Sequence, residues 1–408
     1  MAAHKPEFNV LALNDDCLKR ILNFLSLMDL CTTSEIPTIG VEFSDNERIL
    51  KHFGDRITSS SFLKHKFPVS LNEGQVSLIF EWLGKYCTET VERFVIAGIR
   101  RYTFPPTAIA FLSNVRSVEF CYPLSSDELE AAFGSGRQLN ILKLYGPFHH
   151  GPFHFANHRM PHLKTLEYSV HVNSPTDFDQ IDSFFRNHTQ LDDLLIEFRN
   201  NQQSHYAIDL SFLSHLSDLT KLRLILNGSK VKGTASLSHL NSLWELIVDG
   251  SYDKETDLEI LERLGSVESL VTLEVTMPDV SHVLRGIERF KNLTYLRIFG
   301  DGIVDISSLA QLRSNCTELE VCCKMLTEPN SLVDVVRNLN KLEAIKLDCQ
   351  VALSETVCTD LAKVCSSQDR KIFIVLENVL LAKVGFDFSF IERFNENNEK
   401  FVDIRFFN

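Results

Sequence analysis

The sequence predicts an α/β fold in which parallel strands form the inner layer of a curved solenoid and helices lie outside. The first observation is a recurring phrase with a leucine, two variable residues, a second leucine, one variable residue and an apolar residue, as in residues 293–298. The second is the spacing of the phrase, which recurs about every 25 residues. The third is that most phrases precede a loop and a helical pattern. The phrases begin at Val91, Val115, Leu139, Leu163, Leu191, Leu219, Leu243, Leu270, Leu293, Cys316 and Leu342.

This phrase and its period resemble the leucine-rich repeat, whose units have roughly 20–29 residues. The resemblance covers residues 57–408 and implies a repeat array that forms one continuous body. The asparagine or cysteine usual after the strand of such repeats is mostly missing, and Asn227 is the clearest match. We therefore expect an irregular array with loops of varying length, whose function depends on the surface that it presents.

Composition excludes several classes of function. The chain has 408 residues and a net charge of −13, which argues against nucleic acid as a partner. The N-terminal residues have no apolar signal core, and no apolar run approaches the roughly 20 residues of a membrane span. We expect no membrane partner and a cytoplasmic or nuclear location. In such a reducing compartment the ten cysteines are expected to be free thiols.

The N-terminal part of the chain carries helical signals. Residues 1–12 are predicted to be a disordered lead, and residues 13–54 to form three short helices in succession. Asn14 or Asp15 can cap the first helix, which has an apolar stripe at helical spacing. Ser26 and Ser44 each begin a capping box for a further helix.

The run LNDDCLKRILNFLSLMDL, residues 13–30, resembles the first half of an F-box. It has the leucine, the acidic turn, the double apolar pair, the Phe-Leu pair and the Leu-x-Asp-Leu second helix of that motif. The family then continues with a Val-Cys-x-x-Trp/Phe-like segment, where this chain has SEIPTIG at residues 34–40. The alternative interpretation is a plain helical cap, because any solenoid has to cover its first repeat.

Together the two resemblances imply an F-box protein with leucine-rich repeats, the substrate receptor of a cullin-type ubiquitin ligase. Its partners would be a Skp-family adaptor with its cullin complex, and an unknown target protein held by the repeats. Such a subunit acts by proximity, so we expect no enzymatic activity, catalytic residue, metal or cofactor. The residues that the resemblance implies for adaptor binding are Leu13, Leu18, Ile21, Leu22, Leu25 and Leu30.

Residues 55–90 are predicted to be a linker and N-terminal cap, with a worn strand in 56–62 and a helix that packs Trp82. The solenoid is predicted over residues 91–408, and its last two strands, 372–376 and 401–406, form a C-terminal cap. Its helices are predicted around residues 125–133, 178–185, 256–264, 330–339, 354–365 and 389–394.

Strand alternation predicts the exposed inner face of the solenoid. The residue between the second leucine and the final apolar residue points away from the core, so these residues form a middle column across the strands. Charges in this column alternate in sign, and neighbours should neutralise one another. The middle column is Val95, Glu119, Lys143, Glu167, Leu195, Arg223, Ile247, Glu274, Arg297, Glu320 and Lys346.

A first column lies two residues before the middle column, and a third column lies two residues after it. Because the middle column neutralises itself, specificity for a target has to come from these two flanks. Aromatic residues there are candidate anchors, since such residues often dominate protein interfaces. We predict that the target-binding residues on this face include Tyr145, Arg223, Tyr295, Arg297 and Phe299.

Five histidines between His149 and His162 raise the possibility of a metal site. Pro147, Gly151, Pro152 and Pro161 interrupt any helix there, so we interpret the segment as a loop. A metal-dependent enzyme is the least favoured alternative. A ligase-independent repeat scaffold or inhibitor comes first among the alternatives, followed by an extracellular recognition receptor, which the missing signal sequence disfavours.

Overall fold

The structure, a computed structural model, describes the greater part of the repeat region. The six leucine and isoleucine positions implied for adaptor binding, and the histidines from His149 to His158, lie outside the described residues. The structure describes residues 51, 59–63, 78, 81, 82, 84–87, 91–97, 115–121, 138–145, 159–172, 174, 176–200, 206–250, 254–277, 284, 286–312, 315–351, 353–377 and 388–407.

The chain divides into two compact units, Met1–Leu191 and Asp192–Asn408. In the part of the first unit that the structure describes, five strands pair in parallel and in chain order. They are β1 (Ser59–Leu63), β2 (Arg93–Ala97), β3 (Ser117–Cys121), β4 (Ile141–Leu144) and β5 (Thr165–Val172), and the helix α7 (Thr176–Asn187) follows them. The strand expected around residues 56–62 is therefore present, and it belongs to the parallel sheet.

Among the described residues of the second unit, nine strands form one parallel sheet in chain order. They are β6 (Asp193–Asn200), β8 (Lys221–Ile225), β10 (Glu245–Asp249), β11 (Thr272–Thr276), β12 (Tyr295–Phe299), β14 (Glu318–Leu326), β15 (Ala344–Gln350), β16 (Ile372–Glu377) and β17 (Val402–Phe407). Two short strands, β7 (Ile208–Asp209) and β9 (Val231–Lys232), pair separately, and β13 (Ile303–Val304) pairs with β14. The two predicted terminal strands, 372–376 and 401–406, are confirmed.

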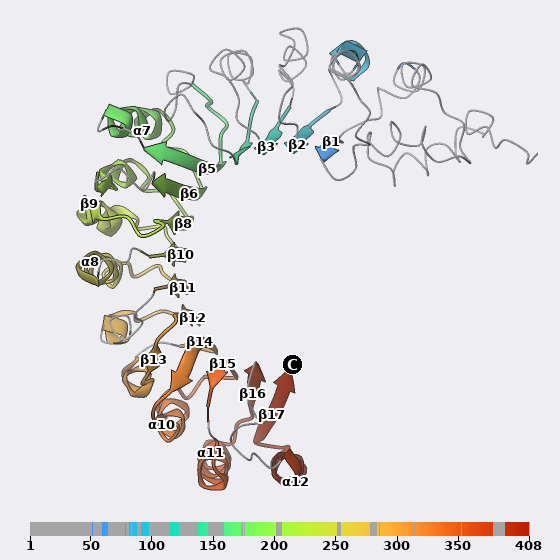
Figure 1. The fold of residues 1–408 in the computed structure, drawn as a ribbon, viewed down its shortest axis with the longest axis vertical. Helices are drawn as coiled ribbons and strands as arrows, with labels where there is room; N and C mark the ends of the chain where they lie inside the picture. The colour runs from blue at the N-terminus through green and yellow to red at the C-terminus, as the bar shows by residue number, and fades with distance from the viewer. Residues whose placement is uncertain are drawn as a thin grey trace, which may run out of the picture. The chain divides into compact units, whose positions relative to one another are not determined.

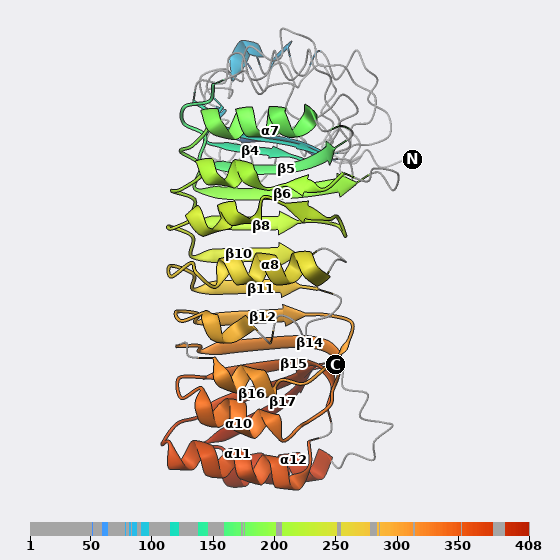
Figure 2. The same ribbon diagram turned by 90° about the vertical axis from the view of Figure 1, so that its left-hand side faces the viewer.

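The connections of the second unit carry its helices. Within this unit, Figure 1 shows the strands on the inner side of an arc and the helices on the outer side, and Figure 2 shows helices in front of the strands. The α-helices are α8 (Lys254–Leu264), α10 (Ser331–Asn338), α11 (Glu355–Ser367) and α12 (Phe388–Asn398). The prediction of parallel strands inside and helices outside is confirmed for the described part of this unit. No helix among the described residues is both long and apolar enough to cross a membrane.

Neighbouring strands pair in the same register, so the recurring sequence phrase places equivalent residues side by side. Leu296 of β12 lies between Leu273 of β11 and Leu319 of β14, and all three side chains are buried. The same alternation of buried and partly exposed residues repeats along β8, β10, β11 and β15. Each buried leucine therefore packs on its equivalent in the next repeat, which gives the array its continuous core.

Several outer connections, at which the sequence predicted no particular helix, are 3₁₀-helices. They are η6 (Ser211–His215), η7 (Thr234–His239), η8 (Ile287–Arg289) and η9 (Ser307–Gln311). Around η6 the amides of Leu213, Leu216 and Leu219 each donate to the carbonyl three residues earlier. These leucines recur every third residue, and three residues make one turn of a 3₁₀-helix, so all of them reach the core.

Asn227 shows what the usual asparagine of such repeats does. Its side-chain amide donates to the backbone carbonyl of Phe198 in β6, at 3.0 Å. Its backbone has φ 47°, a left-handed conformation that asparagine tolerates better than most residues, and Gly228 follows with φ 77°. Asn227 therefore turns the chain out of β8 and satisfies a carbonyl of the preceding repeat.

Candidate functional site

The predicted middle column is confirmed by the strand registers within each unit. In the first unit Val95, Glu119, Lys143 and Glu167 are direct neighbours, but Val95 is buried and not exposed as predicted. In the second unit the column runs in register from Leu195 on β6 to Lys346 on β15, and continues with Val375 and Arg405. One row of side chains therefore lies on the same face of the nine strands described in the second unit, and Glu320 is the member of this row that its neighbours bury.

Charges of this column pair across strands as the sequence predicted. Arg297 lies 3.2 Å from Glu274 and 3.4 Å from Glu320, measured between guanidinium nitrogens and carboxylate oxygens. Lys346 lies 3.1 Å from Glu320 and 3.0 Å from Glu377. The ion pairs form one chain of alternating sign from β11 to β16. Each exposed pair contributes little stability, but together they neutralise the middle of the face.

Glu320 is the centre of this chain and is itself buried. Burial alone would raise its pKa, but hydrogen bonding from Lys346 and the charge of Arg297 outweigh burial, so the pKa lies below its usual value. The hydroxyl of Tyr295 also donates to Glu320, at 3.1 Å. Burial and the negative charge of Glu320 raise the pKa of Tyr295 to about 12. Glu320 therefore remains an anion and Tyr295 a neutral donor at neutral pH.

The other predicted target-binding residues also lie on the strand faces. Arg223 of β8 is partly exposed and lies 3.8 Å from Glu245 of β10. Tyr145 directly follows β4 in the first unit, where its amide donates to the carbonyl of Phe120 at 2.7 Å. Four of the five predicted residues, all except Tyr145, belong to the second unit, and of these Tyr295 and Arg297 share a network with Glu320.

The third column of the second unit differs from the middle column. Its members are direct neighbours across β6 to β16, and no lysine or arginine is among them. They are Glu197, Ile225, Asp249, Thr276, Phe299, Cys322, Asp348 and Glu377. Burial and the nearby carboxylate of Glu197 raise the pKa of Asp249. This column therefore combines acidic and apolar side chains.

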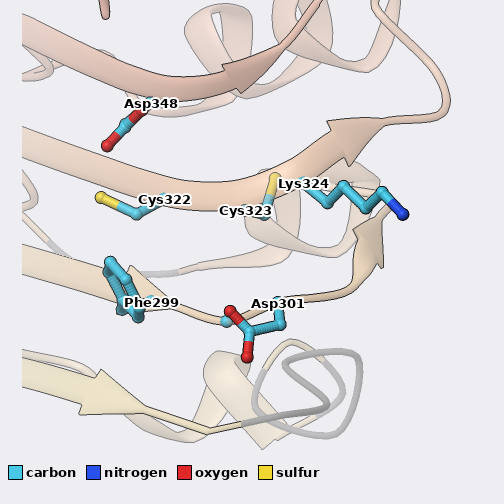
Figure 3. Close-up of a pocket in the computed structure, with 7 residues that line it drawn as sticks. Phe299, Asp301, Cys322, Cys323, Lys324 and Asp348 are labelled. Carbon is cyan, nitrogen blue, oxygen red and sulfur yellow. The ribbon is translucent and has the colours of Figure 1, made fainter. Parts of the chain in front are cut away.

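A pocket of about 310 Å³ lies at the carboxyl ends of β12, β14 and β15. Its lining residues are Phe299, Gly300, Asp301, Cys322, Cys323, Lys324 and Asp348. In Figure 3, Phe299, Cys322 and Asp348 project toward the same side from neighbouring strands, whereas the side chain of Lys324 extends away from them. Phe299 is 41% exposed, so the pocket has an accessible aromatic wall beside a carboxylate.

The two cysteines of the pocket differ, because a hydrogen bond with Cys349 lowers the pKa of Cys323 whereas the pKa of Cys322 is raised. Burial and the carboxylates of Glu320 and Asp348 raise the pKa of Cys322 to about 11, so its thiol stays protonated at neutral pH. Cys322 and Cys323 are both buried free thiols. The described residues contain no group of three or more histidine, cysteine or acidic side chains arranged to hold a metal ion.

Two exposed aromatic residues of the strand side were not among the predicted binding residues. Trp244 is 39% exposed, directly precedes β10 and has the ammonium of Lys221 4.7 Å from its ring centre. Phe373 is 40% exposed, and it lies in the first column of β16 with Lys371 and Arg405 near its ring. Phe373 lies two residues before the middle column, so the strand pattern in the sequence could have placed it on the exposed face. The exposure of Trp244 depends on packing around the start of β10.

Comparison with known proteins adds little to this description. No protein-family profile and no curated protein matches the chain. Among solved structures, it is similar to the crystal structure of the mouse RP105/MD-1 complex, with 13% sequence identity and a TM-score of 0.39. The alignment covers 85% of this chain and 54% of that one, so this chain spans about half the length of the other. The fold assignment rests on the strand registers and helices described above.

Proposed function

We propose that this chain is a non-catalytic protein-binding subunit whose strand face holds a target protein. The observation that carries the proposal is the contrast between charged and aromatic side chains on this face in the second unit. The middle column neutralises itself by ion pairs, while Phe299, Trp244 and Phe373 remain exposed beside it. Exposed aromatic residues next to satisfied charges are typical of surfaces that bind proteins.

We further propose that the chain is the substrate receptor of a cullin-type ubiquitin ligase and acts in the cytoplasm or nucleus. The support is the resemblance of residues 13–30 to an F-box, together with a repeat array after it. Residues 13–54 would dock on a Skp-family adaptor, and the repeats would present the target. The target would then lie close to the enzyme that carries ubiquitin, and this proximity promotes the transfer of ubiquitin to the target. The chain therefore needs no catalytic residue of its own.

Copurification with the adaptor tests the ligase part of the proposal. The full chain is coexpressed with a Skp-family adaptor as wild type and as Leu22→Asp, which places a charge in the proposed apolar docking stripe. We expect the wild type to retain the adaptor and the variant to lose it. A wild type that does not bind would remove the ligase function and leave the repeat scaffold or inhibitor. Equal binding by both would show that the stripe is not the docking surface.

A further inference from the structure

Two cysteines stand opposite each other where β14 and β15 leave their regular register. The register shifts between Cys322 and Met325, so that two residues of β14, of which Cys323 is the first, oppose the single residue Cys349 of β15. A bulge of this kind re-aims the side chains next to it. Neighbouring strands lie about 4.8 Å apart, and the Cα atoms of a disulfide lie roughly 4.4–6.8 Å apart. Strand geometry therefore places Cys323 and Cys349 within reach of a disulfide.

The two thiols are already in contact in the reduced protein. The Cys349 thiol donates a hydrogen bond to the sulfur of Cys323, and both residues are buried free thiols. Figure 3 shows the sulfur of Cys323 on the side of its strand that faces the strand of Asp348, which is β15. A covalent bond between the two sulfurs therefore needs no rearrangement of the strands.

The surroundings make Cys323 the nucleophile of the pair. The hydrogen bond from Cys349 and a second from the amide of Met325 outweigh burial and hold the pKa of Cys323 below its usual value. The same contact between the thiols, together with burial, raises the pKa of Cys349. Because the thiolate is the reactive form, Cys323 reacts first with an oxidant. Cys323 also lines the pocket of about 310 Å³, which gives a small oxidant a path to it.

We propose that Cys323 and Cys349 form a redox site that a hydroperoxide oxidises to a disulfide and that cellular thiols reduce again. This inference goes beyond the proposed protein-binding function and does not depend on it. In a reducing compartment the disulfide is transient, because thiol exchange restores both cysteines. While it lasts, it ties β14 to β15 at the end of the strands that lines the pocket.

The reaction has two steps and consumes one hydroperoxide. The Cys323 thiolate attacks one oxygen, the O–O bond breaks, and the leaving oxygen takes up the proton that Cys323 released, which yields a sulfenic acid and an alcohol, or water from hydrogen peroxide. The sulfur of Cys349 then attacks the sulfur of Cys323. The S–O bond breaks, and hydroxide leaves with the proton of Cys349 as water. The two thiols lose two electrons, and the hydroperoxide gains them.

Cys322 is the competing partner, because it is adjacent to Cys323 in the sequence. Successive side chains of a strand point to opposite faces, and Cys322 projects to the same side as Phe299 and Asp348. Burial and the carboxylate of Glu320 raise the pKa of Cys322 to about 11, so its thiol stays protonated at neutral pH. The disulfide is therefore expected between the two strands and not between the adjacent residues.

Peptide mapping of the full chain tests the proposal. Reduced protein is treated with hydrogen peroxide, alkylated in denaturant, digested without reductant and analysed by mass spectrometry. We expect the loss of two of the ten thiols and one cross-linked peptide pair that contains Cys323 and Cys349. Dithiothreitol should restore both thiols. The map of the wild type decides the assignment even where a variant fails to fold.

Two variants separate the roles of the pair. Cys323→Ser should abolish the loss of thiols. In Cys349→Ser the hydroxyl still donates to Cys323 but cannot form a disulfide, so trapping of the Cys323 sulfenic acid by dimedone should rise about fivefold or more. The matched control is Cys358→Ser with Cys365→Ser, which removes two buried thiols of α11 whose pKa values are raised by burial. Its yield of the cross-linked peptide should change less than about twofold.

The other outcomes would overturn the proposal. They are no loss of thiols, a disulfide that involves Cys322 or a second copy of the chain, or oxidation of Cys323 to a sulfinic acid without a disulfide. An equal loss of cross-linking in the control variant would also overturn it, because the reaction would then not belong to this pair. None of these outcomes bears on whether the chain retains the adaptor.

Discussion

The middle and third columns of the second unit run side by side on the same strands, but their charged side chains are arranged differently. In the middle column Glu274, Arg297, Glu320 and Lys346 satisfy one another across neighbouring strands. In the third column Asp249 and Asp348 are separated by Thr276, Phe299 and Cys322, which carry no positive charge. The difference teaches that alternation of sign along a repeat array builds an internally satisfied surface. Where the alternation fails, acidic and apolar side chains share the surface instead.

Leu296 gives the largest expected loss of stability among these residues, because it is fully buried on the core side of β12. It is the neighbour of Arg297, which belongs to the middle column. Leu296→Ala is expected to lower the free energy of unfolding by about 3 kcal/mol, through lost burial and the cavity left between neighbouring repeats. Urea unfolding followed by circular dichroism measures this change. A loss below about 1 kcal/mol would mean that the leucine columns do not carry the stability of the array.

Glu320→Gln is the sharper test of the middle column. Its partners Arg297, Lys346 and Tyr295 would face a neutral amide, and we expect the free energy of unfolding at pH 7 to fall by about 2 kcal/mol. The matched control is Glu318→Gln, an exposed residue of the same strand, which should change stability by less than about 0.5 kcal/mol.

The effect of Glu320→Gln should also depend on pH. Because the folded-state pKa of Glu320 is lower than its ordinary value of 4.5, its contribution to stability is fully present above that value. It is lost as pH falls through the lower, folded-state pKa. Wild type and variant should therefore differ most near pH 7 and converge in acid below pH 4.5. A difference that stays constant from pH 7 to pH 3 would show that the charge of Glu320 is not what stabilises the network.

Phe299→Ala in the third column is expected to have the smallest effect on stability, about 1 kcal/mol or less, because its ring is partly exposed at the edge of the pocket. The same substitution should weaken the binding of a target protein to the strand face, since it removes the aromatic wall. Urea unfolding and a binding titration on one preparation separate the two effects. A stability loss as large as that of Leu296→Ala would place Phe299 in the core and remove it from the binding surface.

The sequence predicted much of the repeat region because its signals are local and periodic. Leu222, Leu246, Leu273, Leu296 and Leu319 recur with the phrase, and the structure places them in register and buries them. The helix predicted around residues 354–365 is also present as α11, and the Ser354 hydroxyl at its start accepts from the amide of Val357 at 3.3 Å. The sequence predicted no helix at residues 211–215, 234–239, 287–289 or 307–311, where the structure has 3₁₀-helices.

The sequence by itself determined the repeat, the parallel strands and the alternating charges of the middle column, because each follows from spacing along the chain. Only the tertiary structure decided that Asp301, Cys323 and Asp348 line one pocket beside Phe299, since three different strands and their loops supply these side chains. Likewise, only the structure decided that Glu320 is buried among three partners. The burial of a side chain and the electrostatic potential around it depend on residues of several neighbouring repeats. No single stretch of the sequence therefore determines them.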